Sequence, residues 1–146
     1  KNIKFNKLMY RSRSRFGSIL VESREVIMYL KNKLDKVKVL AVVADQSPRI
    51  NSRKIWSKML NQETAFLESI EFIPRFTDSH VYFASMKKTS RGRYEVNLEH
   101  INDSKILKKN QILERYISCM ETQINENPGE WLWSHRRWKL TPENNQ

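Results

Sequence analysis

The sequence is poor in cysteine and glycine, and it has no long hydrophobic run. Cys119 is the single cysteine among 146 residues, which excludes an internal disulfide and any CxxC metal site. With three glycines in all, the chain has no glycine-rich loop of the kind that cradles phosphates. No apolar stretch approaches the roughly 20 residues that a membrane-spanning helix needs, and no signal peptide is visible.

Positive charge is what the sequence has in excess. It contains 27 lysines and arginines against 16 aspartates and glutamates, which gives a net charge of +11 and a pI near 9.9. Such a chain is attracted to nucleic acid, to anionic lipid headgroups or to a phosphorylated substrate. The length fits one domain with a core of its own. Lys1 is not an initiator methionine, so we expect a fragment or a processed product.

Residues 37–48 are the stretch around which the rest of the chain is expected to be organised. Within them, residues 40–44 form a short valine-rich run, which predicts a strand buried on both faces. Asp45 and Gln46 follow directly, and ligands of open α/β sheets bind beyond the carboxyl ends of such strands. We therefore expect Asp45 and Gln46 to border a site, although an aspartate before a turn can also simply cap the loop.

Apolar spacing and turn residues predict the other elements. They indicate helices at residues 5–16, at 23–34 with Ser23 as the cap, from Asn61 or Thr64 to Pro74, and around 113–124, strands at 18–21 and 55–60, and a hairpin of 80–87 with 93–101. Helices alternating with strands favour an α/β fold with a mixed, mostly parallel sheet flanked by helices.

The C-terminal tail, residues 131–139, is the least ordinary stretch. Its members that could form an anion clamp with aromatic walls are Trp133, His135, Arg136, Arg137 and Lys139. The alternative is that Trp131 and Trp138 anchor the tail to the core while the charges face water. We expect both to hold in part, with the tryptophans structural and at least one arginine functional.

Other groups favour structural interpretations. The basic side chains of the first helix could hold a phosphate or form a solvated face, and they are Lys7, Arg11, Arg13 and Arg15. Cys119 lies beside the buried stripe of the last helix and is predicted to be a structural thiol. The three histidines show no metal-ligand spacing, and His100 with Asp103 gives only a weak HxxD pattern. No catalytic centre follows from the residues alone.

Five motifs in order resemble one family. They are Arg13-Ser-Arg-Phe-Gly17, Ala44-Asp-Gln-Ser-Pro48, Trp56 with Asn61-Gln-Glu-Thr-Ala-Phe66, Arg91-Gly-Arg-Tyr94, and Trp131-Leu-Trp-Ser-His-Arg-Arg-Trp-Lys139. Together they resemble the C-terminal half of bacterial lipid A biosynthesis lauroyl/myristoyl acyltransferases in their Bacteroidetes form. The tail motif is the most specific part.

The resemblance implies an acyltransferase at the cytoplasmic face of the bacterial inner membrane, peripheral in this chain. Such enzymes move a fatty acyl chain from acyl-acyl carrier protein to a hydroxyl of a phosphorylated glucosamine lipid. A histidine followed five positions later by a carboxylate supplies the general base, and neither a metal nor another cofactor is needed. The implied partners are the carrier protein, the phosphorylated glycolipid and an anionic membrane surface.

The chain departs from the family at that catalytic motif. Ser85, Lys105 and Leu140 stand five positions after its three histidines, so the resemblance implies no catalytic residue here. The motif would precede Lys1. Residues 1–140 would then be the C-terminal part of a glycerolipid-acyltransferase-like domain, incomplete and inactive alone, and residues 141–146 a frayed tail.

Eight residues are expected to bind substrate. Carry-over from the family gives Arg13 or Arg15, Asp45, Gln46, Arg136 and Arg137, and the aromatic clamp of the tail adds Trp133 and His135. Two alternatives remain, a non-catalytic basic module for anionic lipid or carrier protein, and a nucleic-acid-binding domain. The absence of a helix-turn-helix or RRM signature, and the gathering of tryptophans in one tail, count against nucleic acid.

Overall fold

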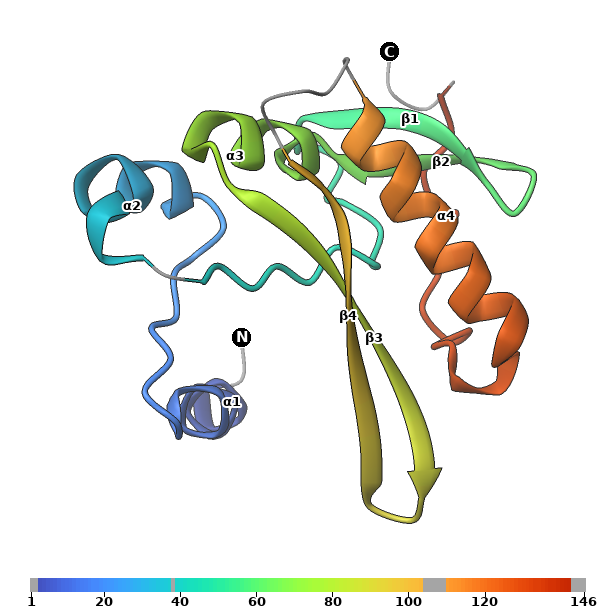
Figure 1. The fold of residues 1–146 in the computed structure, drawn as a ribbon, viewed down its shortest axis with the longest axis horizontal. Coiled ribbons are helices and arrows are strands. Elements are labelled where there is room, and N and C mark those ends of the chain that lie inside the picture. Colours follow the sequence, from blue (N-terminus) through green and yellow to red (C-terminus); the bar gives the residue numbers. More distant parts are fainter. Residues whose placement is uncertain (1–2, 38, 104–109, 143–146) are drawn as a thin grey trace. The chain divides into compact units, whose positions relative to one another are not determined.

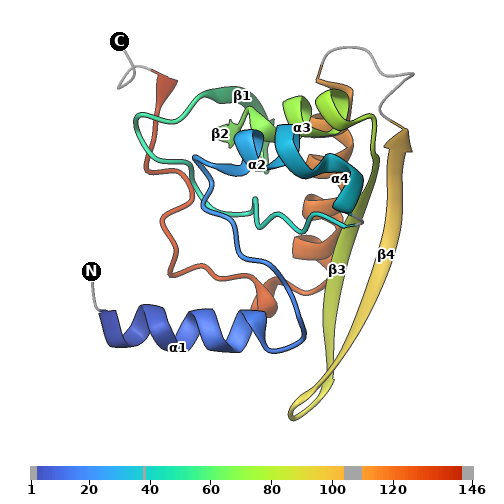
Figure 2. The ribbon, with the colours of Figure 1, turned by 90° about the vertical axis from the view of Figure 1, so that its left-hand side faces the viewer.

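A computed structural model describes residues 3–37, 39–103 and 110–142, and it divides the chain into two compact units, residues 1–40 and 41–146. The first unit is helical in its described residues, and the second contains both sheets and the long helix α4 (Figures 1 and 2). The predicted mixture of helices and strands is confirmed.

The first unit consists of α1 (Ile3–Ser14), α2 (Val26–Lys33) and the short 3-10 helix η1 (Leu34–Lys36). Both predicted helices are confirmed, and Gly17 (φ +84°) ends the first, its N–H donating to the carbonyl of Ser14. The predicted cap at Ser23 is wrong, because Glu25 is the N-cap and makes no side-chain capping bond. Residues 18–21 form no strand.

The predicted central strand is wrong. Residues 40–44 are irregular, and Val42 and Val43 are 53% and 76% exposed. A strand needs a neighbour to accept and donate its backbone hydrogen bonds, and no described residue pairs with this run. The run's apolar composition indicated a buried strand but could not supply that neighbour. Ala44 and Pro48, at the two ends of the following loop, are buried.

The second unit begins its regular structure with a tight hairpin. Strands β1 (Lys54–Met59) and β2 (Gln62–Leu67) pair antiparallel, with Met59 opposite Gln62. The two loop residues, Leu60 and Asn61, both have positive φ angles of 48° and 61°, as a type I′ turn requires. The strand predicted at 55–60 is confirmed, whereas the helix predicted from Asn61 or Thr64 is wrong over its first half.

The second hairpin is longer and agrees with its prediction. Strands β3 (His80–Ser90) and β4 (Arg93–Asp103) pair antiparallel around Arg91 and Gly92, where Gly92 has φ +74°. A register shift between Lys88 and Ser90 adds one residue before the turn. In Figure 1 this hairpin runs crosswise to β1 and β2, and its turn projects away from them. Both sheets have two strands and are antiparallel, so the predicted mostly parallel sheet is wrong for the described residues.

Helix α4 (Gln111–Glu126) supplies the centre of the core, as its predicted stripe indicated. It packs against residues of both hairpins. The buried cluster consists of Met59, Phe66, Phe83, Ile101, Leu113, Ile117 and Met120. The helix ends at Asn127, and the 3-10 turn η3 (Pro128–Glu130) leads into the tail. Trp131 and Trp138 pack against the core cluster, which confirms that these two tryptophans anchor the tail.

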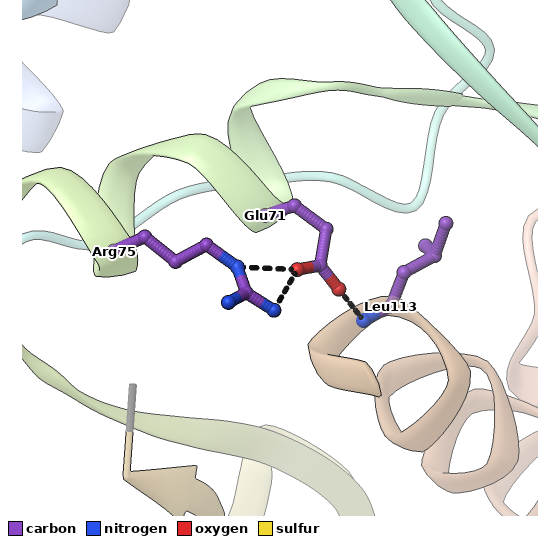
Figure 3. Close-up of polar contacts among 3 residues, drawn as sticks. All are labelled: Glu71, Arg75 and Leu113. Atoms are coloured by element: carbon purple, nitrogen blue, oxygen red, sulfur yellow. Dashed lines mark hydrogen bonds and ion pairs between the residues drawn. The ribbon is translucent and has the colours of Figure 1, made fainter. Parts of the chain in front are cut away.

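Helix α3 (Ser69–Thr77) joins the N-terminus of α4 through a buried carboxylate. Glu71 is 5% exposed; its carboxylate accepts a hydrogen bond of 2.8 Å from the backbone N–H of Leu113 and one of 3.0 Å from Nε of Arg75 (Figure 3). The first N–H groups of a helix have no partner within it, and Asn110, the N-cap of α4, makes no side-chain cap. Glu71 therefore caps α4 from a neighbouring helix.

Candidate functional site

The C-terminal tail returns to the loop that holds Asp45 and Gln46. The backbone N–H of Ser47 donates to Nε2 of His135 over 3.0 Å, although the two residues are 88 positions apart in the chain. Because Nε2 accepts this bond, it carries no proton, and the ring hydrogen of His135 is on Nδ1. The most specific motif of the tail thus contacts the loop predicted to border a site.

Arg137 is buried at the same place. Its side chain is 2% exposed, its Nη1 donates to the carbonyl of Ala65 over 2.8 Å, and its guanidinium lies over the ring of Phe66. Among the described residues, Nε and Nη2 have no hydrogen-bond partner. Burial lowers the pKa of Arg137, while Tyr116 and Asp45 raise it. The guanidinium therefore keeps part of its donor capacity unused.

Asp45 and Tyr116 complete the electrostatics around Arg137. Burial raises the pKa of Tyr116 well above its usual value, the charge of Asp45 raises it further, and Arg137 lowers it. The hydroxyl of Ser47 is also buried without a partner among the described residues. Buried polar groups without partners are rare in folded proteins, and the buried side-chain atoms without one in the described part of the chain belong to Ser47 and Arg137.

Trp138 extends the attachment of the tail along β2. Its indole Nε1 donates to Oγ1 of Thr64 over 2.9 Å, next to the carbonyl of Ala65 that Arg137 uses. We call this group of residues the tail–loop junction: Asp45, Ser47, Thr64, Ala65, Phe66, Tyr116, His135, Arg137 and Trp138.

The structure brings three of the eight predicted site residues into this junction: Asp45, His135 and Arg137. Gln46 is exposed beside them in the chain, as is Arg136. Trp133 is 54% exposed and donates from Nε1 to the carbonyl of Pro128 over 2.7 Å.

Arg13 and Arg15 belong to the first unit. Both side chains are exposed, and the guanidinium of Arg15 lies over the ring of Phe16 at 5.4 Å. Their environment is that of a basic surface.

The junction residues of β2 and α4 were not among the predicted site residues; they are Thr64, Ala65, Phe66 and Tyr116. Tyr116 stands three residues after Leu113 and therefore lies beside the helix's buried stripe, which was a usable signal. The carbonyl of Ala65 carries no signal in the sequence at all.

The other two histidines, His80 of β3 and His100 of β4, contact each other. Nδ1 of His80 and Nε2 of His100 are 3.3 Å apart, and both rings are exposed. In the part of the chain that the structure describes, no three histidine, cysteine, aspartate or glutamate side chains are grouped so as to hold a metal ion. Cys119 is half-buried, and burial together with Glu99 raises its pKa, as suits a structural thiol.

No helix in the described residues is both long enough and apolar enough to cross a membrane.

Comparison with known proteins gives one family. The model of the family described as bacterial lipid A biosynthesis acyltransferase matches residues 1–140, which is nearly the whole chain and includes the tail–loop junction. No curated protein and no solved structure matches the chain. Because the family match spans far more than half of its length, the chain belongs to the bacterial lipid A biosynthesis acyltransferase family.

Proposed function

We propose that this chain is the C-terminal portion of an enzyme, of the Bacteroidetes type, that transfers a fatty acyl chain from acyl-acyl carrier protein to a lipid A precursor. Membership of the family over residues 1–140 supports acyl transfer in lipid A biosynthesis. The observation that carries the proposal further is the bond between Ser47 and His135. It joins the family-like tail to the Asp45–Gln46 loop.

The junction suggests two roles for the predicted site residues. His135 joins the tail to the loop through Ser47, Arg137 joins the tail to β2, and the charge of Asp45 acts on Arg137. Gln46, Trp133 and Arg136 are exposed and can reach a substrate. An exposed arginine can bind a phosphate with two parallel hydrogen bonds, so Arg136 is the residue of the tail that we assign to a phosphate of the glycolipid. Arg13 and Arg15, on the exposed basic surface of the first unit, remain predicted substrate-binding residues.

The reaction needs a base for the acceptor hydroxyl, and the chain offers no suitable histidine. Nε2 of His135 already accepts the N–H of Ser47, and His80 and His100 contact each other. No histidine of this sequence has a carboxylate five positions later. We therefore propose that the histidine–carboxylate pair comes from a segment upstream of Lys1. That histidine would take the hydroxyl proton as the oxygen attacks the acyl thioester and return it to the thiolate of the carrier protein, which leaves as the C–S bond breaks.

The charge of the chain fits the proposed partners. A net charge of +11 attracts both an acidic carrier protein and a phosphorylated glycolipid in an anionic membrane. We place the protein peripherally at the cytoplasmic face of the inner membrane.

The test is acyl transfer by the complete reading frame that contains this chain. Acyl-acyl carrier protein and a phosphorylated lipid A precursor would be supplied, and the product detected by mass spectrometry. Arg136→Ala should raise the KM for the glycolipid roughly tenfold or more, since a charge-assisted hydrogen bond contributes about 1.5–3 kcal/mol. Arg49→Ala, at another exposed arginine, is the matched control. Absence of transfer by the complete protein, or equal effects of the two variants, would refute the proposal.

A further inference from the structure

The hairpin of β3 and β4 has one face on the core and one face in solvent. Side chains of a strand point alternately to opposite faces. Phe83 and Ile101 point to the core side, where both are buried and Phe83 packs edge-on against Tyr116 of α4. The residues at the alternate positions point away from α4. We call these the free face of the hairpin: Tyr82, Ala84, Met86, Lys88, Tyr94, Val96, Leu98 and His100.

The free face is apolar and exposed. Its members stand directly opposite one another across the two strands, as Ala84 does to Leu98 and Met86 to Val96. The large apolar side chains are between 52% and 64% exposed: Tyr82, Met86, Tyr94, Val96 and Leu98. A contiguous apolar surface of this kind marks a place of interaction.

Charge on the hairpin is distributed unevenly between its two faces and along its length. The free face contains no acidic residue. Glu95 and Glu99 stand at the positions that alternate with it and so point to the other side. Four basic residues gather around the turn, and all are exposed: Lys87, Lys88, Arg91 and Arg93. The hairpin is therefore apolar along its free face and cationic at its tip, where Lys88 lies on the free face and Lys87 and Arg93 on the opposite face.

We propose that the free face of this hairpin docks on an anionic lipid bilayer. This deepens the proposed function, which places the protein at a membrane and leaves the contacting surface unnamed. Interfacial binding grows with the apolar area that enters the headgroup region and with the attraction of basic residues to anionic lipids. The free face supplies the first and the tip supplies the second. Tyr82 and Tyr94, at opposite ends of the face, are a residue type enriched at membrane interfaces.

Charge and surface chemistry disfavour the other occupants of such a face. A second copy would bring another +11 charges against the first, and such self-repulsion keeps proteins apart. An acidic protein or a nucleic acid would use the basic tip but would leave the aliphatic side chains of Met86, Val96 and Leu98 without apolar partners. The bilayer is the occupant that satisfies both parts.

The test compares variants of the complete protein on vesicles. Vesicles of phosphatidylcholine alone, and of phosphatidylcholine with phosphatidylglycerol, would be sedimented with the protein. Replacing Val96 and Leu98 by serine should weaken binding roughly tenfold, because less apolar area enters the lipid. The matched control replaces Val42 and Val43, which are also exposed, by serine and should leave binding unchanged.

Charge is tested separately. Arg91→Gln with Arg93→Gln should weaken binding to the anionic vesicles by roughly 30-fold at low ionic strength, on the basis of about 1 kcal/mol per basic residue. Lys31→Gln with Arg49→Gln removes the same charge elsewhere and should have a clearly smaller effect. Equal losses for the two pairs would show attraction by net charge alone and would overturn the assignment to the hairpin.

Three further outcomes would also overturn it. If the Val96 and Leu98 variant lowers the unfolding temperature by several degrees, the face is covered within the complete protein. If the unchanged protein is a dimer that the same variant dissociates, the face is an interface between copies. If the variant binds vesicles as before, the face takes no part in docking.

Acyl transfer to a detergent-solubilised precursor separates this inference from the proposed function. Docking variants that keep activity in detergent and lose it on vesicles would support both. A protein without transfer in either assay, whose vesicle binding still depends on the hairpin, would refute the proposed function and leave the docking supported.

Discussion

The guanidinium of Arg137 lies over the ring of Phe66, with 4.7 Å between the guanidinium carbon and the ring centroid. Its Nη1 also donates to the carbonyl of Ala65, the residue before that phenylalanine. Arg136, its neighbour in the tail, is exposed. Two adjacent arginines of one motif therefore occupy opposite environments, and we expect them to differ in what they contribute.

Replacing Arg137 should destabilise the protein, whereas replacing Arg136 should not. Arg137→Ala removes a hydrogen bond and a cation–π contact and leaves a cavity, so we expect the free energy of unfolding to fall by about 3 kcal/mol. Arg136→Ala should change it by less than about 0.5 kcal/mol, as is usual for surface substitutions. Urea unfolding followed by tryptophan fluorescence measures both, and comparable losses would contradict a buried, structural Arg137.

Glu71 should be needed for the first turn of α4. In Glu71→Ala the N–H of Leu113 loses its acceptor and the ion pair with the partly exposed Arg75 is lost, which should cost about 2–3 kcal/mol of unfolding free energy. Glu68→Ala is the control in the same segment, since the carboxylate of Glu68 pairs with Arg53 at 4.0 Å on the surface, and such exposed pairs contribute little.

Hydrogen exchange locates the effect of the Glu71 substitution. The amide of Leu113 should exchange faster in Glu71→Ala than in the unchanged protein and remain protected in Glu68→Ala. Uniform loss of protection throughout α4, with no excess at its first turn, would show that Glu71 acts through packing and does not cap the helix.

The sequence correctly predicted the helices and turns that depend on residues close together in the chain. The stripe around Leu113 and Ile117 gave α4, because burial at a spacing of three and four residues belongs to the helix itself. Gly92, which adopts a positive φ, marked the turn of the second hairpin. The first hairpin escaped prediction because its turn uses Leu60 and Asn61, and a leucine at positive φ is a poor signal for a turn.

Long-range pairing could not be predicted from such patterns. The valine-rich run at residues 40–44 indicated a buried strand, yet burial depends on a partner that periodicity does not identify. Three members of the candidate site were predicted, Asp45, His135 and Arg137, but the residues that they contact were not. The bonds of His135 with Ser47 and of Arg137 with Ala65 join residues 88 and 72 positions apart. The sequence could not distinguish the buried arginine of the tail from the exposed one, because both stand in the same motif.

Alkaline pH should destabilise the protein through Tyr116. Its pKa is raised in the folded state, first by burial and then by Asp45, so the folded protein holds the phenolic proton more tightly than the unfolded chain does. The favourable contribution is complete below the ordinary tyrosine pKa of about 10. Above that pH the unfolded chain loses its proton first, and stability falls by about 1.4 kcal/mol per pH unit.

Replacing Tyr116 tests this dependence. Tyr116→Phe should remove this part of the decline between pH 9 and pH 11, which is about one pH unit on either side of the ordinary tyrosine pKa. Tyr94→Phe, at an exposed tyrosine, should retain it. Unfolding in urea at the two pH values measures the difference, and identical slopes for the two variants would show that Tyr116 titrates as an exposed tyrosine does.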